Sequence, residues 1–197
     1  LLAILVSLTI ATPWHKLNEY SFPTYVKEFR RYYAKEEIAM RRSIVEANLA
    51  TIRAHNRDPT QTWKMGVNQF TDRTEAERNA YLGARPGSHK NVQPVSLQGV
   101  EIKDSVDWRE QGVITAVKDQ GRCGSCWAFA ASEQVESYHA IAHNNNVILS
   151  EQQILDCTPN PRHCGGTGGC GGGTVELAYD SLIKMGGLAS EWTYPYM

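Results

Sequence analysis

All five cysteines of this 197-residue chain lie between Cys123 and Cys170, so the first 122 residues must fold without disulfides. The two parts of the chain also differ in charge. Residues 13–101 carry 14 Lys and Arg against 10 Asp and Glu, whereas residues 102–197 carry 6 against 11. These opposite net charges favour docking of one part on the other. Neither part has the density of basic residues that nucleic acid or an anionic membrane requires, so we expect no nucleic-acid and no membrane partner.

The chain begins with an apolar run, Leu1–Ala11 (LLAILVSLTIA). This run is too short to cross a bilayer, which needs about 20 residues, but it suits the core of a secretory signal peptide. The alternative is a buried hydrophobic strand. We predict that residues 1–11 are a partial signal peptide, because no initiator Met and no basic segment precede them. Secretory entry permits disulfides and leads to the lysosome, the vacuole or the outside of the cell.

Helical periodicity marks three segments of the first part. Pro23 suits the first turn of a helix, and aromatic residues recur at helical spacing through YVKEFRRYY. A longer amphipathic pattern covers residues 36–56. A third, short helix is predicted within residues 71–83, with Gly83 as its C-cap.

Residues 84–100 contain two Pro and two Gly without periodicity, which predicts an exposed linker and a domain boundary. Beyond it, a buried helix is predicted to begin close to Cys126. Its predicted apolar face comprises Trp127, Ala128, Ala131, Val135, Tyr138, Ile141 and Ala142. Ser150, followed three residues later by Gln153, predicts the start of another short helix. The glycine-rich segment HCGGTGGCGGG predicts an irregular loop.

The segment 120–129 reads Gln-Gly-Arg-Cys-Gly-Ser-Cys-Trp-Ala-Phe. A cysteine that opens a helix meets the positive end of the helix dipole, which stabilises a thiolate, so Cys126 is placed to act as a nucleophile. Gln120 is placed to aim its side-chain amide at an oxyanion, together with the backbone N–H of Cys126. The alternatives are an inert buried cysteine and a redox pair, because Cys123 and Cys126 also form a C-x-x-C.

Two further patterns lie in the first part. Residues spaced by 4, 4, 3, 4 and 4 share one face of the long predicted helix. These residues are Glu37, Arg41, Val45, Asn48, Ile52 and Asn56. The pattern resembles the ERFNIN motif of cathepsin L-type propeptides, with Val45 in place of the usual phenylalanine. Downstream, the four specified positions of the G-x-N-x-F-x-D motif of the same propeptides are matched by Gly66, Asn68, Phe70 and Asp72.

The segment around Cys126 resembles the C-G-[SA]-C-[WY] signature of papain and cathepsin cysteine proteases. Together with the two propeptide motifs, the resemblance covers roughly residues 22–197. It implies an α+β papain-like fold, present here mainly as the helical left domain plus an α-helical inhibitory propeptide. It also implies the zymogen of a cathepsin L-like cysteine endopeptidase that hydrolyses peptide bonds through an acyl-enzyme, with Cys126 as nucleophile and Gln120 as oxyanion donor.

The resemblance divides the chain into four parts. They are a partial signal peptide (1–11), an inhibitory propeptide (22–82), a linker with the activation cleavage (83–101) and the N-terminal half of the peptidase domain (102–197). It also implies a set of substrate-binding residues, in which glycines let a substrate backbone approach closely. These are Gly124, Trp127, Gly172, Gly173, Thr174 and Val175. The alternative for the glycine-rich loop is a flexible loop without contacts.

The family pairs the cysteine at Cys123 with the one at Cys170, and pairs the one at Cys157 with a partner beyond the end of this chain. Cys164 has no counterpart that the resemblance supplies. His163 and Cys164 together suggest zinc, but their spacing matches no standard ligand pattern.

The histidines His139 and His143 lie one turn apart on the predicted central helix and are a second candidate metal pair. Solvated histidines at a helix end are the interpretation that we adopt. We therefore expect no metal and no cofactor.

The family's His and Asn follow the catalytic cysteine by about 130 to 150 residues, whereas 71 residues follow Cys126 here. We therefore expect a C-terminally truncated chain that lacks its catalytic base and is inactive by itself. The expected partners of the whole protein are peptide or protein substrates and its own propeptide as an intramolecular inhibitor. The alternative function is a propeptide-like inhibitor, a binding module for cysteine proteases.

Overall fold

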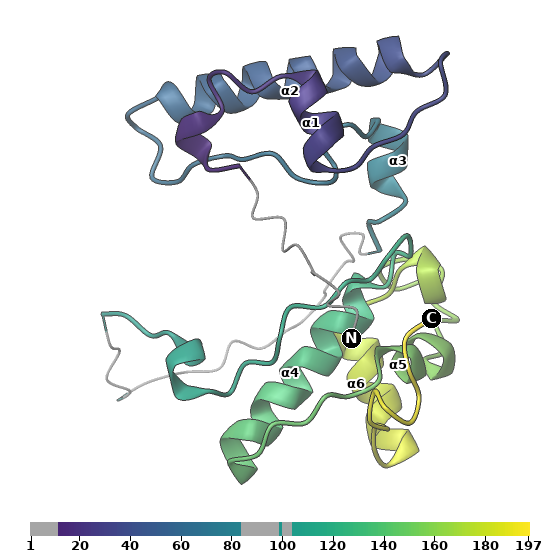
Figure 1. The fold of residues 1–197 in the computed structure, drawn as a ribbon. Helices are drawn as coiled ribbons and strands as arrows, with labels where there is room; N and C mark the ends of the chain where they lie inside the picture. The colour runs from purple at the N-terminus through teal and green to yellow at the C-terminus, as the bar shows by residue number, and fades with distance from the viewer. Residues whose placement is uncertain (1–11, 84–98, 100–103) are drawn as a thin grey trace, which may run out of the picture. The chain divides into compact units, whose positions relative to one another are not determined.

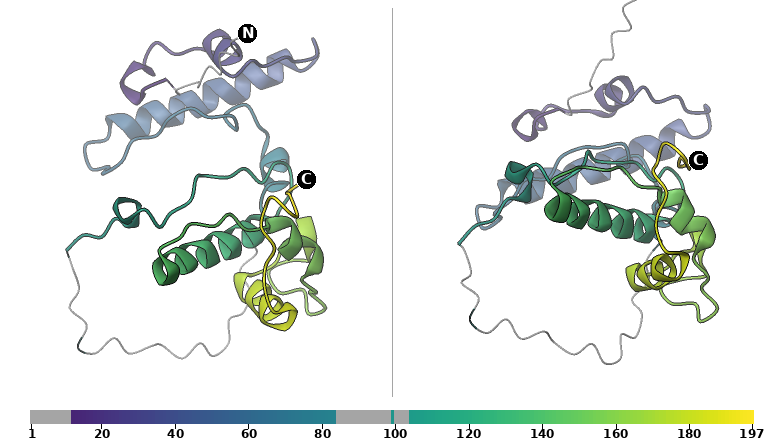
Figure 2. Two further views of the ribbon diagram at one scale, coloured as in Figure 1. Left: turned by 60° about the horizontal axis from the view of Figure 1, so that its bottom comes forward. Right: turned by 90° about the horizontal axis from the view of Figure 1, so that it is seen from below.

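The computed structural model describes residues 12–83, Gly99 and residues 104–197. The chain divides into two compact units, Leu1–Arg78 and Asn79–Met197. Figure 1 and the two further views of Figure 2 show that helices make up the regular structure of each unit. Each unit is treated by itself below.

The predicted signal peptide (1–11) lies outside the described residues, as does the predicted linker (83–101) except for its first residue and Gly99. Across the described ranges no β-strand forms, and the β pairing consists of an isolated antiparallel bridge between Leu149 and Ser190. The prediction of a mainly helical chain is therefore confirmed. No helix in these ranges combines the length and the apolar character that crossing a bilayer requires.

The first unit is built on one long helix, α2 (Ile38–Arg57), against which α1 (Phe22–Glu28) packs. A single 3-10 turn, η1 (Trp14–Lys16), precedes them. Pro23 occupies the first turn of α1, where its missing N–H leaves no helical hydrogen bond unmade. The buried core consists of Leu17, Tyr20, Phe22, Tyr25, Val45, Leu49, Ile52 and Val67. The long helix predicted from periodicity is confirmed. The first predicted helix also forms, but it ends at Glu28, before the end of the predicted pattern at residue 33, because the chain turns at Arg30 with φ +48°.

The motif face of α2 binds the segment that follows the helix. Arg41, which is 7% exposed, donates hydrogen bonds of 2.6 and 2.7 Å to the carboxylate of Glu77 and one of 3.0 Å to Glu37. The hydrogen bonds from Arg41 hold the pKa of Glu77 well below its usual range. This ion pair therefore joins α2 to α3.

Two asparagines of the same face satisfy backbone groups of the returning chain. Asn48 Nδ2 donates to the carbonyl of Thr71 at 2.7 Å. Asn56 makes a reciprocal pair with Met65, donating to its carbonyl at 2.8 Å and accepting from its N–H at 2.7 Å. The apolar motif positions, Val45 and Ile52, lie in the core between these polar ones. The spacing of the motif thus directs its polar side chains to the segment 65–72 and its apolar side chains to the core.

Asp72 is 1% exposed and accepts a hydrogen bond of 2.6 Å from the hydroxyl of Tyr33. The guanidinium of Arg31 lies 3.2 Å from the same carboxylate oxygen. The hydroxyl of Tyr25 donates to the carbonyl of Asn68 at 3.1 Å. The side chain of Phe70 is half-buried. A buried charge is stable only when it is paired, so the contacts of Asp72 with Tyr33 and Arg31 fix the turn that begins at Gly66.

The third helix is shorter than predicted. α3 spans Glu75–Asn79, and Gly83 does not adopt the positive φ of a glycine C-cap. The predicted C-cap is therefore wrong. The physical reason is that Gly83 serves a close approach of two backbones in the second unit, which any Cβ would block.

The second unit is built on α4 (Cys126–His143), which packs against α5 (Glu151–Cys157) and α6 (Val175–Met185). Two 3-10 turns, η2 (Trp108–Gln111) and η3 (Gly169–Gly171), complete its helices. The core residues are Trp127, Ala128, Ala131, Ile154 and Ala178. α6 was not predicted.

The predicted N-cap of α5 is confirmed, because Ser150 Oγ accepts a hydrogen bond of 2.9 Å from the N–H of Gln153. The predicted apolar face of α4 is correct in its first half and wrong in its second. Tyr138 and Ile141 are 64% and 50% exposed. Ser132, Glu136 and Ala140 are buried instead. A carboxylate faces inward here because a lysine, described below, neutralises it.

Candidate active site

Cys126 is the first residue of α4, as predicted, and its side chain is half-buried. The chain reaches the helix through a turn in which Gly121 has φ +59°, a conformation that suits glycine. The carboxylate of Asp119 accepts the N–H of Gly121 at 2.9 Å and supports this turn. The thiol therefore lies at the positive end of an 18-residue helix, where an anion is stabilised.

The first turn of α4 leaves backbone donors free. The N–H groups of Ala128 and Phe129 both bond to the carbonyl of Ser125, at 2.8 and 3.2 Å. Ser125 is the N-cap, yet its side chain makes no capping hydrogen bond. Within the part of the chain that the structure describes, the N–H of Cys126 makes no hydrogen bond. It is therefore available to an anionic ligand beside the thiol.

The amide of Gln120 is held by two backbone carbonyls. Its Nε2 donates to Cys123 at 2.6 Å and to Tyr81 at 2.7 Å. The first bond fixes the side chain beside the turn that leads to Cys126. The second bond shows that the carbonyl of Tyr81 is bound to Gln120 Nε2, the donor that we expected to serve an oxyanion.

From this contact, residues 81–83 continue along the segment Gly171–Gly173, which we call the glycine strip. The N–H of Gly173 donates to the carbonyl of Gly83 at 3.0 Å. A Cβ atom on Gly83 would lie 1.6 Å from the carbonyl oxygen of Gly124, and one on Gly172 would lie 2.2 Å from the carbonyl oxygen of Gly83. Three backbones thus meet where no side chain fits. A short piece of the chain is bound at the positions predicted for a substrate.

The other predicted substrate-binding residues lie next to this strip. Trp127 is 3% exposed, and its indole would lie 2.8 Å from a Cβ on Gly173. Thr174 is the N-cap of α6, accepting the N–H of Leu177, and Val175 opens that helix and packs against the core. Sequence reasoning found these positions but not the helix that they begin.

One disulfide joins the two sides of the site. Cys123, in the turn before α4, is bonded to Cys170, directly before the glycine strip. Cys126, Cys157 and Cys164 are free thiols, and that of Cys157 is exposed at the end of α5. The C-x-x-C redox alternative requires a bond between Cys123 and Cys126, which this structure does not contain.

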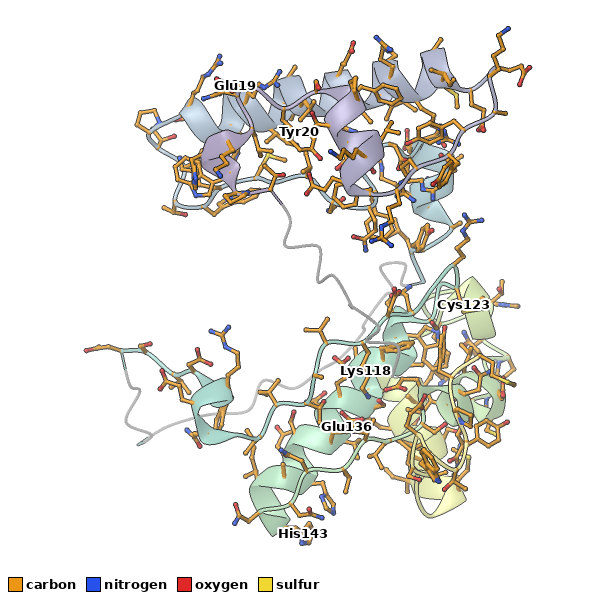
Figure 3. All side chains as sticks on the ribbon, in the orientation of Figure 1. Glu19, Tyr20, Lys118, Cys123, Glu136 and His143 are labelled. Carbon is orange, nitrogen blue, oxygen red and sulfur yellow. A yellow bond between two sulfur atoms is a disulfide. The ribbon has the colours of Figure 1, made fainter. Side chains whose placement is uncertain are left out.

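A buried ion cluster lies on the inner face of α4 (Figure 3). Lys118 Nζ lies 2.6 Å from the carboxylate of Glu136 and also pairs with Glu151, and both acids are at most 1% exposed. Thr115 and Ser132 donate to the two carboxylates at 2.6 and 2.5 Å. Burial lowers the pKa of Lys118, but the bonds to the two glutamates raise it more, so that it lies above its ordinary value.

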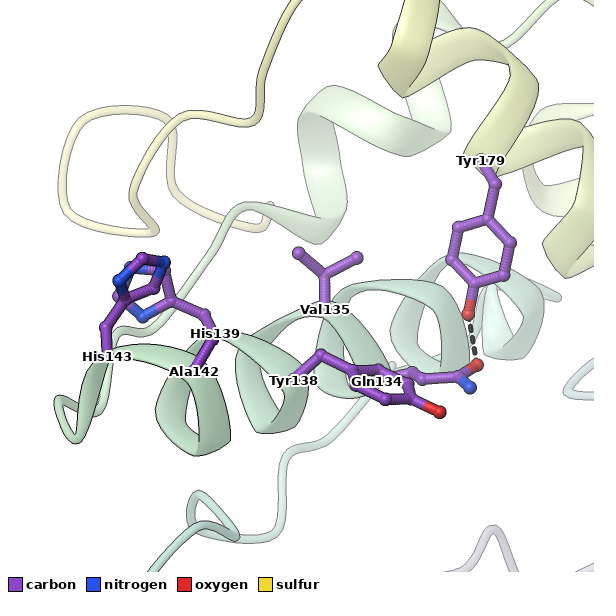
Figure 4. Close-up of a pocket in the computed structure, with 7 residues that line it drawn as sticks. All are labelled: Gln134, Val135, Tyr138, His139, Ala142, His143 and Tyr179. Carbon is purple, nitrogen blue, oxygen red and sulfur yellow. Dashed lines mark hydrogen bonds between the residues drawn. The ribbon is translucent and has the colours of Figure 1, made fainter.

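The histidine pair predicted on α4 lines a cavity of about 490 Å³ at the other end of the helix (Figure 4). The rings of His139 and His143 lie 4.6 Å apart, and His139 Nδ1 lies 3.1 Å from the carbonyl oxygen of Asn145. Among the described residues, no three or more His, Cys, Asp or Glu side chains are grouped as metal ligands. The pair makes no contact with Cys126.

Sequence reasoning missed two features of the site. The occupation of the Gln120 amide by Tyr81 was not predicted, although Gly83, at the start of the predicted linker, was a signal for close approach. Tyr196 was also missed, because its contacts with the site cross 71 or more positions of the sequence.

Comparisons with known proteins agree with these observations. A family model described as "Papain family cysteine protease" matches residues 102–197, and one described as "Cathepsin propeptide inhibitor domain (I29)" matches residues 22–77. Ananain of Ananas comosus is 40% identical over 181 residues, which are 89% of this chain and 50% of ananain. Procathepsin L of Mus musculus is 37% identical over 196 residues, which are 95% of this chain and 54% of that protein.

Two solved structures have the same fold. The recombinant stem bromelain precursor is 37% identical with a TM-score of 0.74, covering 89% of this chain and 56% of its own. The digestive procathepsin L2 of Tenebrio molitor is 34% identical with a TM-score of 0.76, covering 89% and 59%. The chain spans about half the length of the curated relatives that it matches.

Proposed function

Because the chain belongs to the papain family of cysteine proteases and carries an I29-type propeptide domain, we propose that it is part of the zymogen of a cysteine endopeptidase. One observation carries the proposal. Cys126 opens α4 beside the amide of Gln120, and a stretch of the chain, residues 81–83, is bound at the same place. A site that binds chain backbone close to a candidate nucleophile suits hydrolysis of peptides.

In the proposed reaction the thiolate of Cys126 attacks the scissile carbonyl carbon. A sulfur–carbon bond forms and the carbonyl π pair moves to oxygen, where Gln120 Nε2 and the Cys126 N–H donate to the oxyanion. On collapse the C–N bond breaks, and the amine leaves with the proton that the base took from the thiol. The acyl-enzyme that remains is hydrolysed by water to the carboxylic acid and the free Cys126 thiol. The base in this proposal is a histidine, and none of the described histidines makes a hydrogen bond with Cys126.

Residues 81–83 explain how the zymogen is kept inactive in this proposal. A substrate must place its carbonyl at the Gln120 amide, and the Tyr81 carbonyl is there already. A substrate must also form hydrogen bonds with the glycine strip, and the N–H of Gly173 already donates to the carbonyl of Gly83. The propeptide therefore inhibits its own peptidase part, and cleavage in the linker, residues 83–101, releases it. In this division residues 22–82 are the propeptide and 102–197 the first half of the peptidase domain.

We further propose that the protein passes through the secretory pathway and acts in a lysosome or vacuole, or outside the cell. The disulfide between Cys123 and Cys170 supports this route, because such bonds persist in oxidising compartments. The substrates are peptides or proteins bound as extended backbones.

The test is peptide hydrolysis by the whole protein that contains this chain, after cleavage between residues 83 and 101. Hydrolysis should be abolished in Cys126→Ser. In Gln120→Ala, kcat should fall by about 10² to 10³, the usual cost of one oxyanion donor. A whole protein that hydrolyses nothing, but inhibits another papain-type protease, would instead support a propeptide-like inhibitor.

A further inference from the structure

Tyr196 lies close to the candidate active site although it is far from it in sequence. Its hydroxyl donates to the carbonyl of Gln120 at 2.9 Å and lies 2.6 Å from Ser125 Oγ. A tyrosine hydroxyl has one proton, and a carbonyl oxygen only accepts, so Ser125 is the donor to Tyr196. The chain of bonds therefore runs from Ser125 through Tyr196 to Gln120.

The two residues that this chain connects are the ones that set the site's geometry. Gln120 carries the amide assigned to the oxyanion, and Ser125 directly precedes Cys126. Between them the backbone makes the turn with Gly121 at φ +59°, and no secondary structure spans it. Without the Tyr196 hydroxyl, the Gln120 backbone would lose a hydrogen bond that ties it to the start of α4.

Tyr196 itself is rigidly held. Its ring packs edge-on against Phe129, with centroids 4.8 Å apart and an interplanar angle of 74°. Its N–H donates to the carboxylate of Glu191 at 2.8 Å. Since Phe129 is on the first turn of α4, this contact ties the tyrosine ring to the helix that carries Cys126, and the hydroxyl ties Gln120 to the same helix.

The bond to Tyr196 also accounts for an unusual feature of Ser125. A serine at an N-cap ordinarily accepts a hydrogen bond from the second or third N–H of its helix. Ser125 is fully buried and makes no such bond, because its hydroxyl is directed to Tyr196. The first turn of α4 is thus left without a side-chain acceptor that would compete with an oxyanion.

We propose that Tyr196 is a positioning residue, which clamps the backbone of Gln120 to the start of α4 so that its amide is fixed relative to Cys126. Tyr196 touches no reacting atom. The role in catalysis rests on the function proposed above, whereas the clamp itself is a property of the 197-residue chain and is testable without activity.

The chain offers a matched control two residues away. The hydroxyl of Tyr194 donates to Asp156 at 2.9 Å, and the residue is 39% exposed. Tyr196→Phe and Tyr194→Phe therefore remove the same group. The first variant loses two hydrogen bonds, those with Gln120 and Ser125, and the second loses the one with Asp156. Only the Tyr196 hydroxyl is connected to Gln120.

In the 197-residue chain, the measurement is hydrogen exchange of the Gln120 side-chain amide by NMR. Tyr196→Phe should accelerate it about fivefold, the effect of losing one hydrogen bond of ordinary strength, and Tyr194→Phe should leave it unchanged. Equal rates in wild type and Tyr196→Phe would overturn the clamp. An equal acceleration by both variants would also overturn it, because the effect would then be general loosening.

In the whole protein, Tyr196→Phe should lower kcat about tenfold at unchanged KM, and should cost nothing further in a Gln120→Ala background. A loss that persists in that background would refute positioning of Gln120. If the wild-type whole protein hydrolyses no peptide, the proposed function fails, while the exchange measurement on the 197-residue chain still decides whether Tyr196 is the clamp.

Discussion

A Cβ atom on Gly83 would lie 1.6 Å from the carbonyl oxygen of Gly124, so these two glycines are in direct backbone contact. Gly83 is the first residue of the predicted linker, and Gly124 lies in the turn before Cys126. Their contact holds residues 81–83 against that turn.

Replacing Gly83 should therefore release the bound segment. In Gly83→Ala the new methyl group meets backbone, which cannot give way, so the carbonyl of Gly83 moves from the N–H of Gly173. We expect amide exchange at Gly173 to become about tenfold faster, as for a site that opens locally. Gly187→Ala, in open space, is the control. Unchanged exchange at Gly173 in Gly83→Ala would contradict the tight contact.

The 197-residue chain should show no peptidase turnover, whether or not the linker is cut. The described histidines are His15, His55, His139, His143 and His163, and none makes a hydrogen bond with the Cys126 thiol. Within the described residues, the helix dipole is therefore the only activation that the thiol receives. A fluorogenic peptide assay checks this. Hydrolysis that disappears in Cys126→Ser would show the prediction to be wrong.

Removing the disulfide should destabilise the second unit. The bond closes a loop across a sequence separation of 47, and the chain-entropy relation for such a loop gives about 4 kcal/mol. We expect this loss of unfolding free energy in Cys123→Ser/Cys170→Ser, measured by urea denaturation. Cys157→Ser, at an exposed free thiol, should change little. A loss below about 1 kcal/mol in the double variant would contradict the entropic account.

Lys118→Met should be among the most destabilising single changes in the second unit. It would leave the carboxylates of Glu136 and Glu151 buried without a positive partner, a change that typically costs about 3 to 5 kcal/mol. Lys184→Met, near the end of α6, is the control. Urea denaturation of both variants measures the difference, and similar stabilities would refute the role of the cluster.

The sign of the pH dependence follows from the raised pKa of Lys118. A lysine whose pKa is raised on folding stabilises the protein fully below its ordinary pKa of about 10.4. That contribution is lost as the pH rises through the raised value. The stability gap between wild type and Lys118→Met should therefore be large at neutral pH and narrow in strong alkali.

The ion pair between Arg41 and Glu77 should make the first unit sensitive to acid. Because the pKa of Glu77 is lowered on folding, its contribution is present above its ordinary value of about 4.3 and lost as the pH falls through the lowered value. Glu77→Gln should weaken amide protection in α2 by about 1.5 kcal/mol at pH 6, the lower end for bonds to a charged group, since Glu77 is partly exposed.

The matched control is Glu75→Gln, at an exposed acid of the same helix, which should leave protection in α2 unchanged. Below about pH 4.3 the difference between Glu77→Gln and wild type should shrink. A difference that is constant from pH 6 to pH 3 would rule out the carboxylate as its source.

Local spacing was enough to predict much of this protein. The offsets from Glu37 to Asn56 predict one helical face, because a helix repeats every 3.6 residues, and that face binds the segment around Thr71. The start of α4 at Cys126 and the N-cap at Ser150 were likewise readable, since a helix start depends on a few adjacent residues.

Tertiary structure decided what depends on residues distant in sequence. The inward face of α4 carries Glu136 because Lys118 neutralises it, so hydrophobic periodicity predicted the wrong second half. The contact of Gly83 with Gly124 and the bond from Tyr196 to Gln120 join positions that only packing brings together. The sequence by itself therefore determined which residues are candidates for the chemistry, because they lie in short local motifs. The packing of distant segments decided how those residues are held and what covers them.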